Sequence, residues 1–435
     1  MHDSPLALVA ESIILLSIIL ICAKLFGEFF FRYLKLPRVI GELGAGIIIG
    51  PYALGSLSIG NFGPLIHIDQ DSVIPVSQSL YFLANVGAII LLFEAGLETN
   101  KKRFFDNLGS ASFVAIGGVA LPFILGLVAT LIFGFASFDS IQTLIPGLFV
   151  GAMMTATSVG ITARVLGDLG KLDSSVGVTI LGGAVVDDVL GILILAVIVG
   201  IEATGVVSGI GILWISLKAI SFLLVLTLLG SWAAPWISNF IMKLGTKEGF
   251  YKEPSVHLCI ALGLAFLVSG VAEKYFGLAM IIGAYSLGLA LSGTILFKEI
   301  EEPIKKINGF VVPVFFTVIG MQVNLQSIFG SDSLMVTLSF ALVLTIFGIV
   351  SKIIGSGIPA LISGFDRKSS WQIGVGMMPR GEVALIIGGI GLATGVISQT
   401  IFGVTIVMTI VTTILAPIML EKSYKKKSLP NRELK

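Results

Sequence analysis

Long apolar runs dominate this sequence and restrict what it can fold into. Hydrophobic residues make up 55% of the 435 residues, and charged residues only 12%. Soluble domains carry about 25% charged residues. A run of about 20 apolar residues is long enough to cross a bilayer as a helix, which satisfies its backbone hydrogen bonds internally. The sequence therefore predicts an all-α polytopic membrane protein.

Thirteen such runs can be placed along the chain, and several are short or rich in Gly and Pro. The 52 glycines fit membrane helices that pack closely or break. The predicted spans are residues 7–30, 38–55, 76–97, 108–135, 142–163, 174–200, 210–242, 255–273, 277–293, 306–322, 336–363, 371–394 and 400–420.

The basic residues are distributed unevenly between the two sides of this arrangement. Of the 27 lysines and arginines, 22 fall in the odd-numbered connections and the C-terminal tail, whereas only Lys274 falls in an even-numbered connection. Positively charged connections stay in the cytoplasm. We therefore expect a basic cytoplasmic tail at 421–435 and an N-terminus outside. Lys218, within the seventh run, is expected to reach the interface.

The two halves of the chain share motifs. Gly96 in LLFEAGLETN and Gly320 in FFTVIGMQVN are 224 positions apart, and IGELGAG at 40–46 is similar to IGAYSLG at 282–288. Repeat one then covers 7–200 and repeat two 255–420, with the run at 210–242 as a connector helix. A single connecting span makes the two repeats insert with opposite orientation, as in many secondary transporters.

Two adjacent aspartates, Asp187 and Asp188, lie at the centre of the apolar run 174–200. One aspartate at the middle of a membrane helix costs about 2.5–3.5 kcal/mol on insertion scales. A purely structural buried ion pair is one alternative, but an intramembrane carboxylate is by default interpreted as an ion or proton site. Lys352 and Arg380 also lie inside predicted spans.

The fifth and twelfth runs occupy corresponding positions in the two repeats, and both are interrupted in their centres. Interrupted helices at matching positions point to a transporter binding site, where unwound carbonyls and half-helix ends can hold a cation. Hydroxyls there can alternatively hydrogen-bond across packed helices. The interrupting residues are Thr155, Thr157 and Ser158 in the fifth run, and Pro379, Arg380, Gly381 and Glu382 in the twelfth.

Together these motifs resemble the cation/proton antiporter-2 family, and within it the NapA-type sodium/proton antiporters. The resemblance implies thirteen helices with two crossing broken helices, usually in a homodimer. The dimer domain would comprise spans 1–3 and 8–10, and the core domain, spans 4–6 and 11–13, would move like an elevator. The matching segments are LPRVIGELGAGIIIGP (36–51), LLFEAGLE (91–98), TATSVGITARVLGDLG (155–170), the two aspartates, FFTVIG (315–320), Lys352 and MMPRGEVALI (377–386).

The resemblance also implies roles for individual residues. Asp188 matches the essential carboxylate that binds Na⁺ or a proton, and Asp187 matches its neighbour that pairs with a membrane lysine, here Lys352. Residues 155–158 and 379–382 match the two crossover segments. Electroneutral relatives have a Glu five residues before the essential aspartate, where this chain has Gly183. The chain therefore resembles the electrogenic type.

The expected function is exchange of Na⁺, and also Li⁺, for H⁺ in a prokaryotic inner membrane, for pH and sodium homeostasis. No cofactor, no nucleic-acid partner and no attached nucleotide-binding domain is expected. Exchange of K⁺ for H⁺ is the alternative. Glu42 and Glu94 can line an aqueous approach, pair with Arg380, or stay neutral in contact with water.

Other classes of membrane protein fit the sequence less well. An ion channel needs a continuous pore, whereas the inverted repeat with one charged centre favours alternating access. An intramembrane aspartyl protease needs two aspartates that approach a peptide bond from opposite sides. Asp187 and Asp188 are adjacent on one helix, so an enzyme is not expected. A sensor on an antiporter scaffold stays open.

Overall fold

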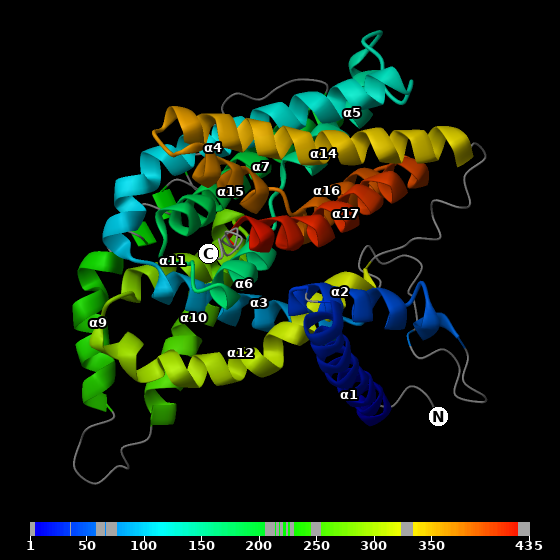
Figure 1. The fold of residues 1–435 in the computed structure, drawn as a ribbon. Coiled ribbons are helices and arrows are strands. Elements are labelled where there is room, and N and C mark those ends of the chain that lie inside the picture. The colour runs from blue at the N-terminus through cyan, green and yellow to red at the C-terminus, as the bar shows by residue number, and fades with distance from the viewer. Residues whose placement is uncertain are drawn as a thin grey trace, which may run out of the picture.

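The computed structural model describes residues 5–34, 36–57, 66, 76–204, 214, 217, 221, 222, 225, 226, 230–244, 254–322 and 334–424. This described part is helical (Figure 1). Its α-helices are α1 (Pro5–Phe29), α2 (Arg38–Ile49), α3 (Gln78–Glu98), α4 (Lys101–Ile132), α5 (Ile141–Thr155), α6 (Val159–Asp168), α7 (Ser175–Thr204), α9 (Gly230–Leu244), α10 (Pro254–Phe276), α11 (Met280–Leu291), α12 (Ile295–Met321), α14 (Leu334–Ile362), α15 (Arg367–Gly376), α16 (Glu382–Ala393) and α17 (Gln399–Tyr424).

The helices agree with the predicted membrane architecture. Ten segments within the described residues are long and apolar enough to cross a membrane, and two shorter apolar helices accompany them. Every predicted span except the seventh coincides with described helix. The seventh is described only in part: residues 230–242 lie in α9, whereas Lys218 lies outside the described residues, as does most of the basic tail. The all-helical membrane fold is confirmed, whereas the count of thirteen stays a prediction.

Two helices begin seven or more residues earlier than the apolar runs predict. α4 begins at Lys101 rather than 108, because the Asn100 side chain caps it by accepting a hydrogen bond from Arg103 N at 3.1 Å. α12 begins at Ile295 rather than 306, and its polar turns carry the ion pairs Glu301–Lys305 and Glu302–Lys306, both 2.7 Å long. Hydropathy finds only the apolar part of such a helix.

The helices pack into two groups. The first helix group contains α1, α2, α3, α9, α10, α11 and α12, and the second contains α4, α5, α6, α7, α14, α15, α16 and α17. In Figure 1, α14, α16 and α17 of the second group lie above α1 and α12 of the first. Each half of the sequence contributes helices to both groups.

Glycines bring the helix backbones of the first group into direct contact. A Cβ on Gly46 of α2 would lie 2.0 Å from the Thr317 carbonyl oxygen of α12, and one on Gly96 of α3 would lie 2.2 Å from the Tyr285 carbonyl oxygen of α11. Real Cβ atoms do not come this close to a carbonyl oxygen, so only glycine fits at these two positions. The pairs α2–α12 and α3–α11 therefore depend on glycine for their close approach.

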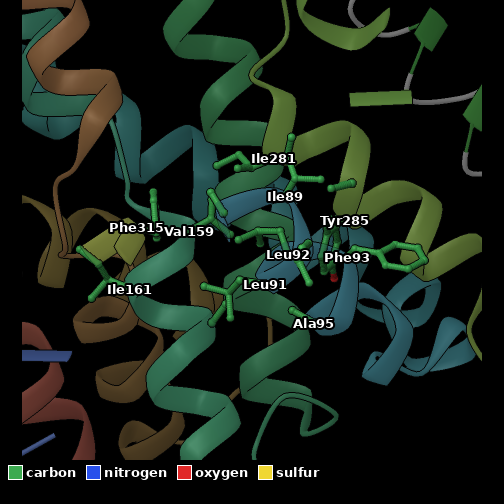
Figure 2. Close-up of a cluster of buried hydrophobic side chains, with 14 of the residues drawn as sticks. Ile89, Leu91, Leu92, Phe93, Ala95, Val159, Ile161, Ile281, Tyr285 and Phe315 are labelled. Carbon is green, nitrogen blue, oxygen red and sulfur yellow. The ribbon is translucent and has the colours of Figure 1, made fainter. Parts of the chain in front are cut away.

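The half-helix α6 makes the most extensive contacts between the two groups, because it packs on α3 and on α2. Figure 2 shows this surface. Val159 and Ile161 of α6 belong to the same apolar cluster as Leu91 and Leu92 of α3 and Phe315 of α12. The contact is apolar at its centre, so few hydrogen bonds or ion pairs join the two groups there.

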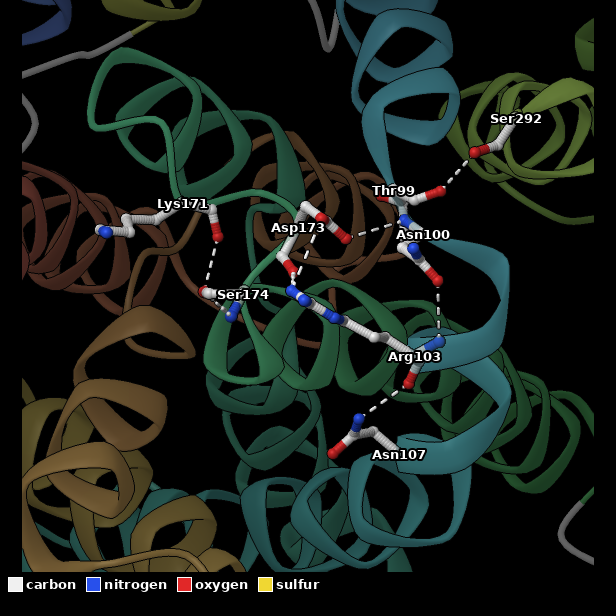
Figure 3. Close-up of polar contacts among 9 residues, drawn as sticks. Thr99, Asn100, Arg103, Asn107, Lys171, Asp173, Ser174 and Ser292 are labelled. Atoms are coloured by element: carbon white, nitrogen blue, oxygen red, sulfur yellow. Dashed lines mark hydrogen bonds and ion pairs between the residues drawn. The ribbon is translucent and has the colours of Figure 1, made fainter. Parts of the chain in front are cut away.

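Polar contacts hold the passage from α3 to α4, where the chain leaves the first group and enters the second (Figure 3). Asp173, in the loop between α6 and α7, accepts a hydrogen bond from Asn100 N at 3.2 Å. Its carboxylate lies 3.5 Å from Arg103 of α4. Ser292, at the end of α11, donates to the Thr99 carbonyl at 2.5 Å. These bonds fix the chain where it crosses from one group to the other.

Candidate functional site

The two aspartates lie buried in the middle of α7. Asp187 is 1% exposed and Asp188 4%. Lys352 of α14, itself 0% exposed, places its Nζ 3.1 Å from Asp187 Oδ1 and 3.3 Å from Oδ2. Adjacent residues of a helix point about 100° apart, so Asp188 faces a different direction from Asp187. The structure thus brings Lys352 to one aspartate of the pair and sets the other at a different angle.

Both interrupted spans are broken where the sequence predicts. α5 ends at Thr155 and α6 begins at Val159, while α15 ends at Gly376 and α16 begins at Glu382. The two breaks touch, because Ser158 N donates to the Pro379 carbonyl at 2.8 Å. Four half-helix ends, with their unpaired backbone groups and partial charges, therefore meet beside α7.

The carbonyls of the second break are all engaged, contrary to the expectation that they are exposed to a cation. Hydroxyls of the first interrupted span donate to the first two carbonyls: Thr162 of α6 donates to Gly376 O at 2.7 Å, and Thr157 of the break donates to Met377 O at 3.2 Å. The Met378 carbonyl accepts from Arg380 Nη1 at 3.1 Å. The Pro379 carbonyl accepts from Ser158 N, and the Arg380 carbonyl accepts from Thr413 Oγ1.

Arg380 is fully buried and bridges the second break to α14. Its guanidinium donates to the Met378 carbonyl, and to the Gly348 carbonyl of α14 at 3.3 Å. Neither Glu42 nor Glu94 forms an ion pair with Arg380 in the described part of the chain; Glu94 instead accepts a hydrogen bond from Asn308. Of the three alternatives open for these carboxylates, an ion pair with Arg380 is therefore not the one found among the described residues.

The three hydroxyls of the first break differ in their surroundings. Thr155 donates back to Ala152 O of its own helix at 2.8 Å, and Thr157 donates across the break. Ser158 is 3% exposed, and its Oγ has no hydrogen-bond partner among the described residues. The described residues also give the carbonyls of Thr155 and Ala156 no donor. The first break thus holds unused oxygens and the second does not.

Glycine at 381 lets the two breaks approach. A Cβ there would lie 2.7 Å from Ser158 Oγ and 2.8 Å from Ser158 Cβ.

Two glutamates near the breaks complete the list of predicted residues. The backbone of Glu382 begins α16, but its side chain lies outside what the structure describes, so the role predicted for it stays a prediction. Glu42 is 1% exposed, and its Oε2 has no hydrogen-bond partner among the described residues.

Sequence reasoning missed Thr162 and Thr413. Thr162 lies one helical turn after Ser158, where only a half-helix that packs on the second break makes it a hydrogen-bond donor. Thr413 lies in the last apolar run and donates to the Arg380 carbonyl. Threonine side chains often hydrogen-bond between packed membrane helices. A threonine close to a break in the sequence was therefore the one feature that could have indicated these hydrogen bonds.

Comparisons with known proteins place the chain in a family. A family model described as "Sodium/hydrogen exchanger, transmembrane" matches residues 16–424. The Na⁺/H⁺-K⁺ antiporter GerN of Bacillus cereus is 35% identical over 95% of this chain and 96% of its own length. The chain belongs to the sodium/hydrogen exchanger family. The expected resemblance to cation/proton antiporters is confirmed.

Two further relatives extend this finding. The high-affinity Na⁺/H⁺ antiporter NhaS3 of Synechocystis is 33% identical to this exchanger-family chain, over 99% of it and 94% of NhaS3. The solved structure of the sodium proton antiporter MjNhaP1 of Methanocaldococcus jannaschii matches with a TM-score of 0.64 at 18% identity, covering 96% of this chain and 97% of MjNhaP1. At that identity the match shows a common fold.

Proposed function

We propose that this protein exchanges Na⁺ for H⁺ across the membrane by alternating access, with Asp188 as the shared site. The observation that carries the proposal is the Asp187–Lys352 ion pair, both partners 0% exposed in their side chains, on the helix that also bears Asp188 and beside two touching helix breaks. The similarity to GerN and NhaS3, which are named as Na⁺/H⁺ antiporters, supports Na⁺ and H⁺ as the exchanged ions.

Na⁺ would bind between Asp188 and the first break. A small hard cation prefers oxygen ligands, and the free oxygens here are Ser158 Oγ and the carbonyls of Thr155 and Ala156. A proton on Asp188 removes the charge that attracts the cation, so the two compete for one place. Exchange follows if only the occupied site crosses.

The crossing itself would be an elevator motion of the second helix group against the first. The apolar surface around α6 supports this, because an apolar contact can slide without breaking specific bonds. Glycine pairing supports an inverted repeat: Gly46 packs against Gly320 and Gly96 against Gly288. In the proposed repeat, Gly46 corresponds to Gly288 and Gly96 to Gly320, so the second contact is the symmetry mate of the first.

The finer properties are proposed on the same basis. We take the first helix group as the dimer domain of a homodimer in a prokaryotic inner membrane, with thirteen spans, the N-terminus outside and the C-terminus in the cytoplasm. The Asp187–Lys352 pair supports electrogenic exchange, in which the lysine releases a proton as the cation binds. Li⁺ would substitute for Na⁺. GerN carries K⁺ in its name, which makes K⁺ the second candidate ion.

The test is exchange in proteoliposomes containing the full-length protein and a pH-sensitive dye. Na⁺, Li⁺ and K⁺ are added in turn to wild type and to Asp188→Asn. Wild type should move protons against Na⁺ and Li⁺ and respond to an imposed membrane potential. The variant should lose at least about 100-fold of its activity, because the carboxylate that the two ions share is gone.

Asp366→Asn is the matched control, since Asp366 caps α15 by accepting from Lys368 N at 3.1 Å, and Asn caps a helix equally well. It should exchange at the wild-type rate. Wild-type exchange by Asp188→Asn across a series of pH values would contradict the assignment of the site.

A further inference from the structure

A cavity of about 290 Å³ opens between the two helix groups, and neither Asp187 nor Asp188 of α7 lines it. It lies between α3, α6 and α12, at the end of the molecule where the basic residues predict the cytoplasm. Its polar lining consists of Glu94 and Glu98 of α3, Arg164 and Asp168 of α6, and Lys305 and Asn308 of α12.

Most of these charges neutralise one another. Lys305 Nζ lies 2.9 Å from Glu98 and 2.7 Å from Glu301. Arg164 lies 3.4 Å from Asp168 of its own helix. Among the described residues that line the cavity, Glu94 is the carboxylate without a cationic partner within ion-pair distance.

Glu94 is instead bonded to a neutral amide that has a spare acceptor. Asn308 donates its Nδ2 to Glu94, is 3% exposed, and has no hydrogen-bond partner for its Oδ1 in the described part of the chain. Buried polar atoms are nearly always hydrogen-bonded or ligated. A carboxylate beside an unused amide oxygen is the ligand chemistry that a hard cation prefers.

The cavity lies a short distance along α6 from the proposed site. Ala163 and Arg164 of α6 line it, and Ser158 immediately precedes that helix. At 1.5 Å per residue, five or six residues span about 8–9 Å along the helix axis. A cation beside Glu94 would therefore be held close to the first break, with the apolar contact of α6 lying between them in this conformation.

We propose that Glu94 and Asn308 form an outer station for a monovalent metal cation, distinct from the exchange site at Asp188. This inference rests on the proposed function and names the residues that supply the cation to it. The station raises the local cation concentration through its net negative charge and its two oxygens. It takes no part in coupling, so it should affect the KM for the cation and leave the maximal rate unchanged.

Glu94→Gln is the decisive variant, because glutamine keeps the size of the side chain and its hydrogen bond to Asn308 but removes the charge. In proteoliposomes with full-length protein at low ionic strength, the KM for Na⁺ should rise about three- to tenfold, the effect of one charge at close range in a partly wet cavity. Added choline chloride should reduce the difference, because salt screens it. The maximal rate should stay at the wild-type value.

Glu98→Gln is the matched control, one turn further along α3 and in the same cavity, but already paired with Lys305. Its KM should change less than about twofold, since Lys305 keeps Glu301 as a partner. Asn308→Ala removes the amide oxygen without changing the charge and should raise the KM by about twofold.

Three results would overturn the station: a wild-type KM in Glu94→Gln, a fall in maximal rate at unchanged KM, or an equal KM shift in Glu98→Gln. Failure of the proposed function looks different, because the wild-type protein itself would then show no cation-dependent proton movement, which would overturn both proposals.

Discussion

The two broken helices share an architecture and differ in how their polar groups are used. In the second break, each carbonyl from Gly376 to Arg380 accepts a hydrogen bond. In the first, Ser158 Oγ and the carbonyls of Thr155 and Ala156 have no partner among the described residues. The comparison indicates a division of roles: the second break holds the geometry, and the first offers ligands.

This asymmetry has a physical reason. A broken helix in a membrane leaves carbonyls and amides that cost free energy unless something binds them. The second break satisfies its carbonyls with Thr157, Thr162, Thr413, Arg380 and a backbone amide. A cation that binds at the first break would satisfy what remains, so the empty state is the one with unmet bonds.

Among changes to the two breaks, the largest expected effect comes from separating them. Gly381→Ala places a Cβ 2.7 Å from Ser158 Oγ, so Ser158 or the second break must move. We expect exchange to fall at least about tenfold and the protein to lose about 1–3 kcal/mol of stability, as overpacked sites do. Transport assays and thermal unfolding in detergent measure both.

Gly109→Ala is the control for replacing a glycine by alanine without a steric clash, because a Cβ at Gly109 of α4 meets nothing within 4 Å. It should exchange normally and be as stable as wild type or slightly more so. Full activity in Gly381→Ala would show that the contact between the breaks is dispensable.

Removal of the free hydroxyl should come next in size. Ser158→Ala takes one oxygen from the proposed cation site and breaks no hydrogen bond of the side chain found in the described residues. The KM for Na⁺ should rise about tenfold, equivalent to about 1.4 kcal/mol, while the melting temperature stays near that of wild type. An unchanged KM would remove Ser158 from the ligand set and weaken the contrast between the breaks.

The smallest effect is expected at the second break. Thr162→Val removes the hydrogen bond to Gly376 O and should cost about 0.5–1.5 kcal/mol of stability, the range for polar contacts between membrane helices. The KM for Na⁺ should stay within about twofold of wild type, because Thr162 is not among the proposed cation ligands and its removal costs only the stability of one hydrogen bond. A Thr162→Val variant with a much higher KM and unchanged stability would reverse the roles of the two breaks.

Much of the architecture was predictable because a bilayer permits few solutions. The apolar runs predicted nearly every described helix, and the interruptions at 155–158 and 379–382 predicted both breaks. The starts of α4 and α12 were not predictable from hydropathy, since capping by Asn100 and ion pairs such as Glu301–Lys305 extend these helices beyond their apolar parts.

The site was predictable at the level of charge and less so at the level of hydrogen bonds. The family resemblance implied the pairing of Lys352 with Asp187, and a buried lysine needs a carboxylate, so this pair could be predicted. The partners of Arg380 could not, because backbone carbonyls such as Gly348 O carry no sequence signal. For the same reason the sequence could not distinguish Thr157, which bonds across the break, from Ser158.

The most direct test of the account is the KM for Na⁺ of the wild-type protein measured across pH in proteoliposomes. If Na⁺ and the proton compete for Asp188, the KM should rise on the acid side by at least about tenfold per pH unit, as linkage requires for that one proton, and more steeply where Lys352 also releases its proton. The maximal rate at saturating Na⁺ should stay constant there. A KM independent of pH, with a maximal rate that falls instead, would mean that the proton acts at a separate place and would contradict the shared site.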